Sequence, residues 1–598
     1  MTEPAFDVVV HATFEAGFKV GGIGAVLDGL LQAPAYCRAV RRTILVGPMD
    51  TTNATEMARL TEPRNRLEII FSSWHQIDGA PAELSAGLRI VESVFRVNLL
   101  YGRRSFAEPA AGEEGACEHE VLLVDARLAD LEETNSFKSA LWQHYRIESD
   151  RYEWNHEFDL VIKGARPALA ALNLLVEEKE GARCLLAHEW MGIPLAFCAQ
   201  TLAPGSWRLV FYAHEMATAR ALIEDHSGHD TRFYNVLQQA RAAGLTLDQV
   251  FGDRSDFFKH ALITRASRFD NILAVGQWVE QELNFLGGNI AAANIDLVYN
   301  GVGAHEISLE ERTVSSAKLR QYCSNLLGYL PDYVFTHVTR MVISKGLWRD
   351  IRVLEHLDRL LDREGKRAVL FMLTSTEPAG RAAEDVRRWE MAYGWPVVHH
   401  VENGDLMGHE EPLYRGIEAH NARSRAIKIV LVNQFGWSRD RCGVKMPAEM
   451  QFDDIRRGTD LEFGQSIYEP FGISQVEPLG SGALSVVSNV CGCIPFVQEA
   501  ARQAGLAHFP NLLQADYTTL TGWMRVDSAW EALGIDHQVR DRLESANSRS
   551  VARAIFATLP VTDKQVRALL KRGQRVSRRM SWDVVAQDYL LPALARAA

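Results

Sequence analysis

Two cations in the segment TRMVISKGLW could hold an anionic ligand. Arg340 and Lys345 flank a short loop between an apolar strand and a helix, whose Leu347, Leu354 and Leu357 predict an apolar stripe. Positive charges at a strand end can neutralise a diphosphate that gains charge as its bond to a sugar breaks. An exposed basic loop without a ligand explains the same two residues, so the pair needs further support.

Two carboxylates lie eight residues apart in YEPFGISQVE. Glu469 comes before a turn at Pro470 and Gly472, where no structural requirement explains an acid, so we expect it to face a ligand. Ser474 and Glu477 have the S-x-x-E spacing of a capping box at a helix that starts near Ser474. Glu477 therefore has two interpretations: it contacts a ligand, or it serves the start of that helix.

A glycine-rich loop follows the first predicted strand. Residues 14–24 read FEAGFKVGGIG, with Lys19 among the glycines and a helix after them. Glycines such as Gly21 and Gly22 let the backbone approach a ligand, and the free N–H groups at a helix N-terminus attract anions. The loop is neither a Walker loop nor a clean GxGxxG fingerprint, so a plain turn remains the alternative.

Short apolar strands alternate with amphipathic helices along the whole chain. This pattern predicts βαβ units and parallel sheets that are covered on both faces, and hence an α/β fold. The predicted strands include DVVVHATF, CLLAH, RLVFYA, NILAV and IDLVY in the first half, and YVFTHV, AVLFMLTS and IKIVLVNQF in the second.

Polar residues stand directly after several of these strands. His188 and Glu189 follow CLLA, His214 follows VFYA, and Arg340 follows FTHVT. Ligands of open parallel sheets bind beyond the carboxyl ends of the strands. These positions are therefore candidates for a binding site, although each could also be an ordinary loop residue.

The length predicts two large domains. A chain of 598 residues exceeds the roughly 250–300 residues at which one hydrophobic core stops growing. The turn at Asn300-Gly301 and the polar stretch after it place the boundary near 303, giving domains at 1–303 and 304–580. We expect an insertion over about 377–465, where the pattern is less regular, and a C-terminal helix at about 581–598.

The composition of the chain restricts the kinds of partner that we expect. Net charge is −12, which argues against sequence-independent binding to nucleic acid or to an anionic membrane. We expect no signal peptide after MTEPAFDVVV, no transmembrane helix, and a cytoplasmic protein. The eight cysteines show no zinc spacing, and no metal or cofactor is expected. Assembly into a homo-oligomer stays open.

Two charged segments suggest ligand sites at first sight, but each has a simpler structural explanation. Residues 224–230, EDHSGHD, favour an acceptor-side or hinge loop over a metal cluster. Residues 564–580 carry seven cations and favour a solvated basic helix face, with an anion site as the alternative.

Taken together, these motifs resemble retaining glycosyltransferases of the two-domain type called GT-B, and glycogen and starch synthases in particular. YEPFGISQVE resembles their E-x7-E segment, Lys19 to Ile23 their K-x-G-G-[LI] loop, and Arg340 with Lys345 their R-x4-K pair. AHEW and MSWDVVAQDYL resemble two further segments, and all matches occur in the expected order. The resemblance implies two Rossmann-like domains with a donor cleft between them.

The resemblance also implies roles for individual residues. Arg340 and Lys345 would neutralise a departing nucleoside diphosphate, Glu469 would contact the hydroxyls of the donor sugar, and Glu477 the ribose. His214 would hold the sugar near its 6-hydroxyl. The remaining implied donor contacts are Lys19, Gly21 and Gly22, and the backbone of Phe471, Gly472, Ile473 and Ser474; His188 and Glu189 are candidates on the acceptor side.

The implied activity is transfer of glucose from ADP- or UDP-glucose to an α-glucan, with retention and without a metal. Three alternatives remain: transfer to a small acceptor, as in sucrose- or mannosyl-type transferases; a non-catalytic glucan-binding protein; and a nucleotide-sugar epimerase. The intact set of Lys19, Arg340, Lys345, Glu469 and Glu477 argues against a non-catalytic protein. The segment AHEMATAR around His214 departs from the synthases, and this leaves the acceptor open.

Overall fold

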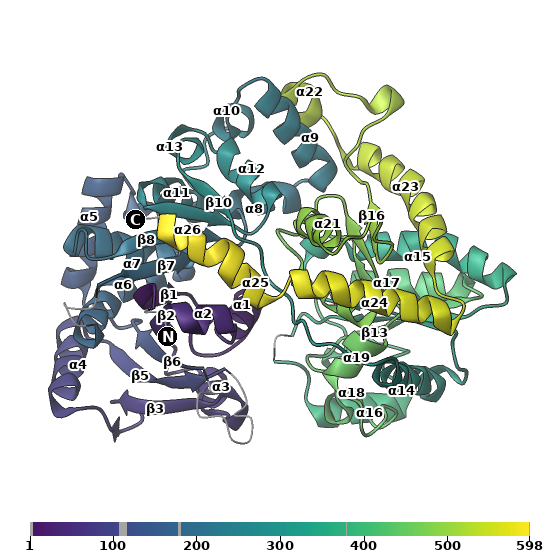
Figure 1. Cartoon of the computed structure of the whole chain (residues 1–598), viewed down its shortest axis with the longest axis horizontal. Coiled ribbons are helices and arrows are strands. Elements are labelled where there is room, and N and C mark those ends of the chain that lie inside the picture. Colours follow the sequence, from purple (N-terminus) through teal and green to yellow (C-terminus); the bar gives the residue numbers. More distant parts are fainter. Residues whose placement is uncertain (1–3, 107–116, 177–180, 378, 597–598) are drawn as a thin grey trace. The chain divides into compact units, whose positions relative to one another are not determined.

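The chain divides into two compact units in the computed structural model, which describes residues 4–106, 117–176, 181–377 and 379–596. The first unit comprises residues 1–218, 245–301 and 582–598, and the second comprises 219–244 and 302–581. Each unit is built around one sheet (Figure 1). Among the described residues, no helix is long and apolar enough to cross a membrane.

The sheet of the first unit has ten strands and is parallel over most of its width. The three strands β5, β3 and β4 at one edge run antiparallel to their neighbours, and the other strand pairs are parallel. In spatial order the strands are β10 (Ile295–Leu297), β9 (Asn271–Ala274), β8 (Arg208–Ala213), β7 (Arg183–His188), β1 (Phe6–Ala12), β2 (Val40–Pro48), β6 (Glu118–Asp125), β5 (Asn98–Ser105), β3 (Leu67–Ser72) and β4 (Ile77–Asp78).

Helices connect these strands, and the end of the chain returns to the same unit. The Trp582 ring fills the space beside Gly29 and Gly301, where a Cβ atom would clash with it, and the Asp583 carboxylate accepts the backbone N–H of Ala35. The helices are α1 (Gly22–Leu30), α2 (Pro34–Ala39), α3 (Ala54–Thr61), α4 (Ala82–Phe95), α5 (Leu131–Tyr145), α6 (His156–Leu175), α7 (Glu189–Leu202), α10 (Leu247–Phe251), α11 (Phe258–Arg265), α12 (Gln277–Phe285), α13 (Gly288–Ala291), α25 (Trp582–Val585) and α26 (Leu591–Arg596).

The second unit has a six-stranded parallel sheet with a hydrophobic core on each face. In β12, Leu370 and Met372 pack into one core, and Val369 and Phe371 pack into the other, as expected for a strand buried on both sides. The spatial order is β13 (Ile427–Val432), β12 (Ala368–Leu373), β11 (Tyr333–Val338), β14 (Leu461–Gly464), β15 (Leu484–Ser488) and β16 (Leu512–Ala515).

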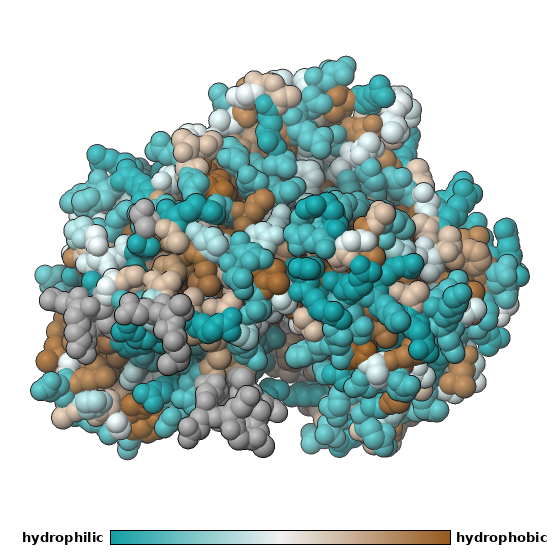
Figure 2. Space-filling model, in the orientation of Figure 1, coloured by the Kyte–Doolittle hydropathy of each residue, from teal (hydrophilic) through white to brown (hydrophobic). Residues whose placement is uncertain are grey.

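The helices of the second unit cover this sheet (Figure 1). They are α9 (His229–Ala242), α14 (Leu309–Leu327), α15 (Leu347–Arg363), α16 (Ala383–Tyr393), α17 (Glu410–Arg423), α18 (Arg439–Cys442), α19 (Phe452–Gly458), α20 (Ile473–Val476), α21 (Ile494–Gln503), α22 (Ala529–Leu533), α23 (His537–Thr558) and α24 (Asp563–Arg579), while α8 (Ala217–Glu224) begins where the chain leaves the first unit. The exposed face of α24 is strongly hydrophilic (Figure 2), as a solvated basic helix would be.

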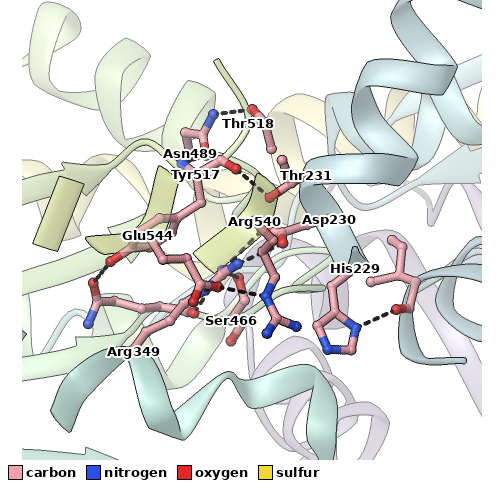
Figure 3. Close-up of polar contacts among 12 residues, drawn as sticks. His229, Asp230, Thr231, Arg349, Ser466, Asn489, Tyr517, Thr518, Arg540 and Glu544 are labelled. Atoms are coloured by element: carbon pink, nitrogen blue, oxygen red, sulfur yellow. Dashed lines mark hydrogen bonds and ion pairs between the residues drawn. The ribbon is translucent and has the colours of Figure 1, made fainter. Parts of the chain in front are cut away.

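Two expectations about the domains are wrong. Residues 219–244 belong to the second unit, not to the first, and within that unit Asp230 on α9 is paired with the buried Arg349 of α15 (Figure 3). The segment at 377–465, which we expected to be an insertion, is part of the sheet, since it supplies β13 and β14 with the helices that connect them. β13 is the predicted strand IKIVLVNQF, whereas the short β14, with the sequence LEFG, was not predicted.

Candidate functional site

The predicted cations and carboxylates of the second unit follow adjacent strands. Arg340 and Lys345 come after β11, and Glu469 comes after its neighbour β14. The backbone joins the two loops, because the carbonyl of Ser344 accepts the N–H groups of Ile467, at 2.8 Å, and of Tyr468. Parallel pairing therefore brings residues that are more than a hundred positions apart to one edge of the sheet.

Lys345 and Glu469 form an ion pair that is largely shielded from water. Lys345 Nζ lies 2.7 Å from Glu469 Oε2, and the same oxygen accepts hydrogen bonds from Ser466 Oγ and Gln475 Nε2. Oε1 has no hydrogen-bond partner among the residues that the structure describes. Lys345 keeps two further N–H donors, so both residues of the pair can still bind a ligand.

The charge of Glu469 is maintained despite its burial. Burial alone would raise the pKa of this carboxyl, but the ion pair and hydrogen bond with Lys345, the Ser466 hydroxyl and the charge of Arg340 together lower it below the usual value. Arg340 itself is exposed. The site thus presents one ionised carboxylate and two cations at neutral pH.

The turn after Glu469 depends on two glycines. Gly472 has a left-handed backbone, with φ of 92°, and a Cβ atom there would lie 2.7 Å from Gln475 Oε1. A Cβ atom at Gly492, in the turn after β15, would overlap the carbonyl of Pro470, and the N–H of Gly492 donates to the Glu469 carbonyl. Close packing of this second turn thus fixes the Glu469 loop.

The capping-box interpretation of Glu477 is wrong. Helix α20 begins at Ile473 after an N-cap at Gly472, and no side chain caps it. The Ser474 hydroxyl donates to the side chain of Gln475, and Glu477 instead pairs with Arg456 at 3.3 Å while staying partly exposed. The backbone of Phe471 to Ser474 does form the start of a helix, but one of only four residues.

In the glycine-rich loop of the first unit, a carboxylate of the same chain occupies the backbone N–H groups. The Glu15 carboxylate accepts the backbone N–H groups of Val20, at 2.6 Å, and of Gly21, so it occupies donors that we expected to face a ligand. A Cβ atom at Gly24 would lie 2.4 Å from Glu15 Oε2, which explains that glycine. Lys19 is half-exposed and pairs with Asp28 at 3.2 Å.

These contacts predict that Glu15 competes with an external anion for the loop. In Glu15→Gln the two N–H groups lose a charged acceptor at the start of α1, and we expect the free energy of unfolding to fall by about 1 kcal/mol. We also expect pyrophosphate to bind several-fold more tightly, measured by calorimetry. Glu68→Gln, at an exposed position of β3, is the matched control. Equal pyrophosphate affinity in Glu15→Gln and the parent protein would contradict the predicted role of Lys19, Gly21 and Gly22.

His188 and Glu189 do not face an acceptor in the way expected. Both ring nitrogens of His188 are engaged, one with His11 and one with His214, each at 2.8 Å. Glu189, which has a left-handed backbone with φ of 57°, is buried and accepts the backbone N–H of Glu215. These residues therefore fix the loop that carries His214. His11 was not among the predicted site residues, although a histidine inside an apolar strand was a visible signal.

One group within the described ranges has metal-ligating side chains close together. Ligand atoms of Cys37, Cys117 and His119 lie within 4.8 Å of one another. The two sulfur atoms are 2.7 Å apart, whereas two thiolates on one tetrahedral zinc ion lie roughly 3.8 Å apart. The spacing therefore does not fit zinc as it stands. In the segment 224–230, His229 contacts the Ile223 carbonyl and Asp230 pairs with Arg349, so these two side chains have structural partners instead.

The comparisons with known proteins agree on the architecture. No family model and no curated protein matches the chain. Among solved structures, the catalytic domain of starch synthase IV from Arabidopsis thaliana, bound to ADP and acarbose, matches with a TM-score of 0.52 and 14% identity, covering 100% of this chain and 99% of that one. A sucrose-phosphate synthase from Thermosynechococcus elongatus matches with a TM-score of 0.50 and 10% identity, covering 97% of each chain.

These likenesses define the class of fold. The chain has the GT-B architecture, with two Rossmann-like α/β domains, and the predicted fold class is confirmed. At 14% and 10% identity the likeness concerns the fold, and the chemistry has to be argued from the site.

Proposed function

We propose that the protein is a retaining glycosyltransferase that uses a nucleotide sugar, and that it transfers glucose from ADP- or UDP-glucose to an α-glucan. The observation that carries this proposal is the Lys345–Glu469 pair at a strand edge, with Arg340 beside it. Two cations can neutralise a leaving diphosphate, and a carboxylate with one free oxygen can accept the hydroxyl groups of a sugar.

The roles proposed for the residues follow from their charges. Arg340 and Lys345 stabilise the negative charge that develops on the nucleoside diphosphate as the glycosidic bond breaks. Glu469 orients the sugar through Oε1 while Oε2 stays with Lys345. Glu477 contacts the ribose, and the backbone of residues 471–474 lies along the sugar and the phosphates. In the first unit, Lys19, Gly21, Gly22 and His214 supply further donor contacts.

The direct test is an assay for released nucleoside diphosphate. The protein is incubated with ADP-glucose, UDP-glucose or GDP-mannose, each with and without glycogen. Release that requires glycogen supports the α-glucan acceptor, whereas release that requires a small sugar or sugar phosphate supports the alternative acceptor class. No release with any donor and acceptor, under conditions in which the protein is folded, contradicts a transferase.

Glu469→Gln tests the carboxylate separately from the fold. The amide removes the charge that pairs with Lys345 and accepts sugar hydroxyls, so we expect turnover to fall about 100-fold. The change is nearly isosteric, and near-native circular dichroism should persist. Glu477→Gln is the control for stability, because its partly exposed pair with Arg456 contributes only about 0–1 kcal/mol. Near-normal turnover in Glu469→Gln would remove the assigned role.

A further inference from the structure

A row of hydrogen-bonded side chains crosses four adjacent strands of the first unit and ends at His214. His11 lies in β1, His188 ends β7, and His214 follows β8, and these strands are neighbours in the sheet. His11 Nδ1 contacts His188 Nε2, and His188 Nδ1 contacts His214 Nε2, each at 2.8 Å. At the other end, His11 Nε2 contacts the Tyr36 hydroxyl at 2.9 Å, and that hydroxyl lies 3.0 Å from Thr43 Oγ1 on β2.

The row is buried and its rings are stacked. His11 and His188 are fully buried, and the ring centroids of each successive histidine pair are 5.1 Å apart. Burial and the neighbouring histidines lower the pKa of His11 and His188 well below the usual value, and burial lowers the pKa of His214 to about 3. All three imidazoles are therefore neutral at neutral pH, and each carries one proton on one of its two nitrogens.

Neutral imidazoles in series cannot choose their tautomers independently. Each nitrogen–nitrogen contact needs one donor and one acceptor, so the direction of the first hydrogen bond determines all the others. If Thr43 donates to Tyr36 and Tyr36 donates to His11, every contact in the row is satisfied in one direction. In the reverse direction two buried atoms lack a partner in the row, the Thr43 hydroxyl proton and the acceptor His214 Nδ1, whereas in the favoured direction only the His214 Nδ1–H does.

The row ends at a ring nitrogen that has no hydrogen-bond partner in the part of the chain that the structure describes. His214 Nδ1 is buried and has no hydrogen-bond partner among the described residues. In the favoured direction His214 Nε2 accepts from His188, and Nδ1 then carries the proton and is a donor. Such an N–H suits an oxygen acceptor on a ligand, such as a sugar hydroxyl or a phosphate.

We propose that His11 and His188 are positioning residues that hold His214 in a single tautomer, with its proton on Nδ1, ready to donate to a ligand oxygen. Tyr36 and Thr43 set the direction of the row. The tautomer is a property of the free protein, and the inference rests on the proposed function only for the identity of the oxygen that His214 meets.

The tautomer of His214 can be measured directly. Nitrogen-15 NMR of ring-labelled, ligand-free protein should show a protonated Nδ1 and an unprotonated Nε2 for His214, assigned by the loss of these signals in His214→Asn. Tyr36→Phe removes the hydroxyl that donates to His11 and should convert His214 to a mixture of tautomers or to the Nε2–H form. Thr43→Val should leave the same signals in place, because the Tyr36 hydroxyl then becomes the terminal donor of the row and still donates to His11. If Tyr36→Phe proves too unstable, the wild-type signals alone test the assignment.

Tyr101→Phe is the matched control, because this tyrosine of the same unit donates to Glu120 and not to a histidine. It should leave the His214 signals unchanged. A wild-type His214 with its proton on Nε2, or a folded Tyr36→Phe protein in which the His214 signals are unchanged, would overturn the proposal. In a transferase assay, Tyr36→Phe should raise the KM for the nucleotide sugar about tenfold. If the protein shows the expected tautomer but no transferase activity, the proposed function is refuted, while the proposed role of His11 and His188 in positioning His214 stands.

Discussion

Lys345→Ala is expected to reduce turnover at least ~100-fold, the scale of losing one preorganised charge at a transition state. The reason is that Lys345 has a double role: it keeps Glu469 ionised in a shielded place, and its remaining N–H groups can reach the leaving diphosphate. Arg340→Ala should have a loss of similar size, because this exposed cation acts on the same charge. The measurement is the rate of nucleoside diphosphate release at saturating donor.

The control separates catalysis from the loss of an ion pair. Lys366 pairs with Asp332 at 2.8 Å on the surface of the same unit, and Lys366→Ala should leave turnover unchanged. A double-mutant cycle with Lys345→Met and Glu469→Gln then asks whether Lys345 acts only through the carboxylate. Additive losses would assign Lys345 a ligand contact of its own, while full-rate Lys345→Ala would refute the donor site.

The sheets and strand edges could be predicted because both signals are local. Apolar runs such as AVLFMLTS marked the strands, and Arg340 stood directly after the predicted strand β11, which turned out to be a neighbour of the unpredicted β14 that precedes Glu469. The structure confirms the α/β class and brings Lys345 and Glu469 together. The roles of these residues remain predictions.

What the sequence did not reveal depends on partners far away along the chain. His11 and His188 are 177 positions apart, and no local sequence pattern predicts their contact. Glu15 lies close to Gly21 in the sequence. Whether its carboxylate accepts the N–H groups of the loop, however, depends on the backbone conformation, which composition does not specify. The S-x-x-E spacing at Glu477 was misleading for a similar reason: the left-handed Gly472 starts the helix one residue earlier, and the Glu477 carboxylate finds Arg456 instead.

Residues 219–244 are joined to the rest of the second unit by, among other contacts, a network of buried charges. Two N–H groups of Arg349 bind the Asp230 carboxylate, at 2.6 and 3.0 Å, and Nε binds Glu544 at 2.9 Å (Figure 3). The guanidinium also stacks on Tyr517, 4.2 Å from the ring centroid. All three charged side chains are fully buried, so the network can be stable only if every charge keeps its partner.

Arg349→Met should therefore destabilise the second unit by about 3–5 kcal/mol, because it leaves the Asp230 carboxylate buried without its cation, while Glu544 keeps its longer ion pairs with Arg352 and Arg540. Thermal and urea unfolding would measure this loss. Arg363→Ala, at the exposed end of the same helix, is the matched control and should cost about 0–0.5 kcal/mol. An unfolding midpoint equal to that of the parent protein would contradict the account of residues 219–244.

The same substitution connects stability to the candidate site. Arg349 also donates to the backbone carbonyls of Gln465 and Ser466, and the Ser466 hydroxyl binds Glu469. Turnover per folded molecule in Arg349→Met should thus fall as well, since the Glu469 loop loses one of its supports. If turnover per folded molecule is unchanged, the bonds from Ile467 and Tyr468 to the Ser344 carbonyl must be sufficient to hold that loop, and the buried network acts on the fold alone.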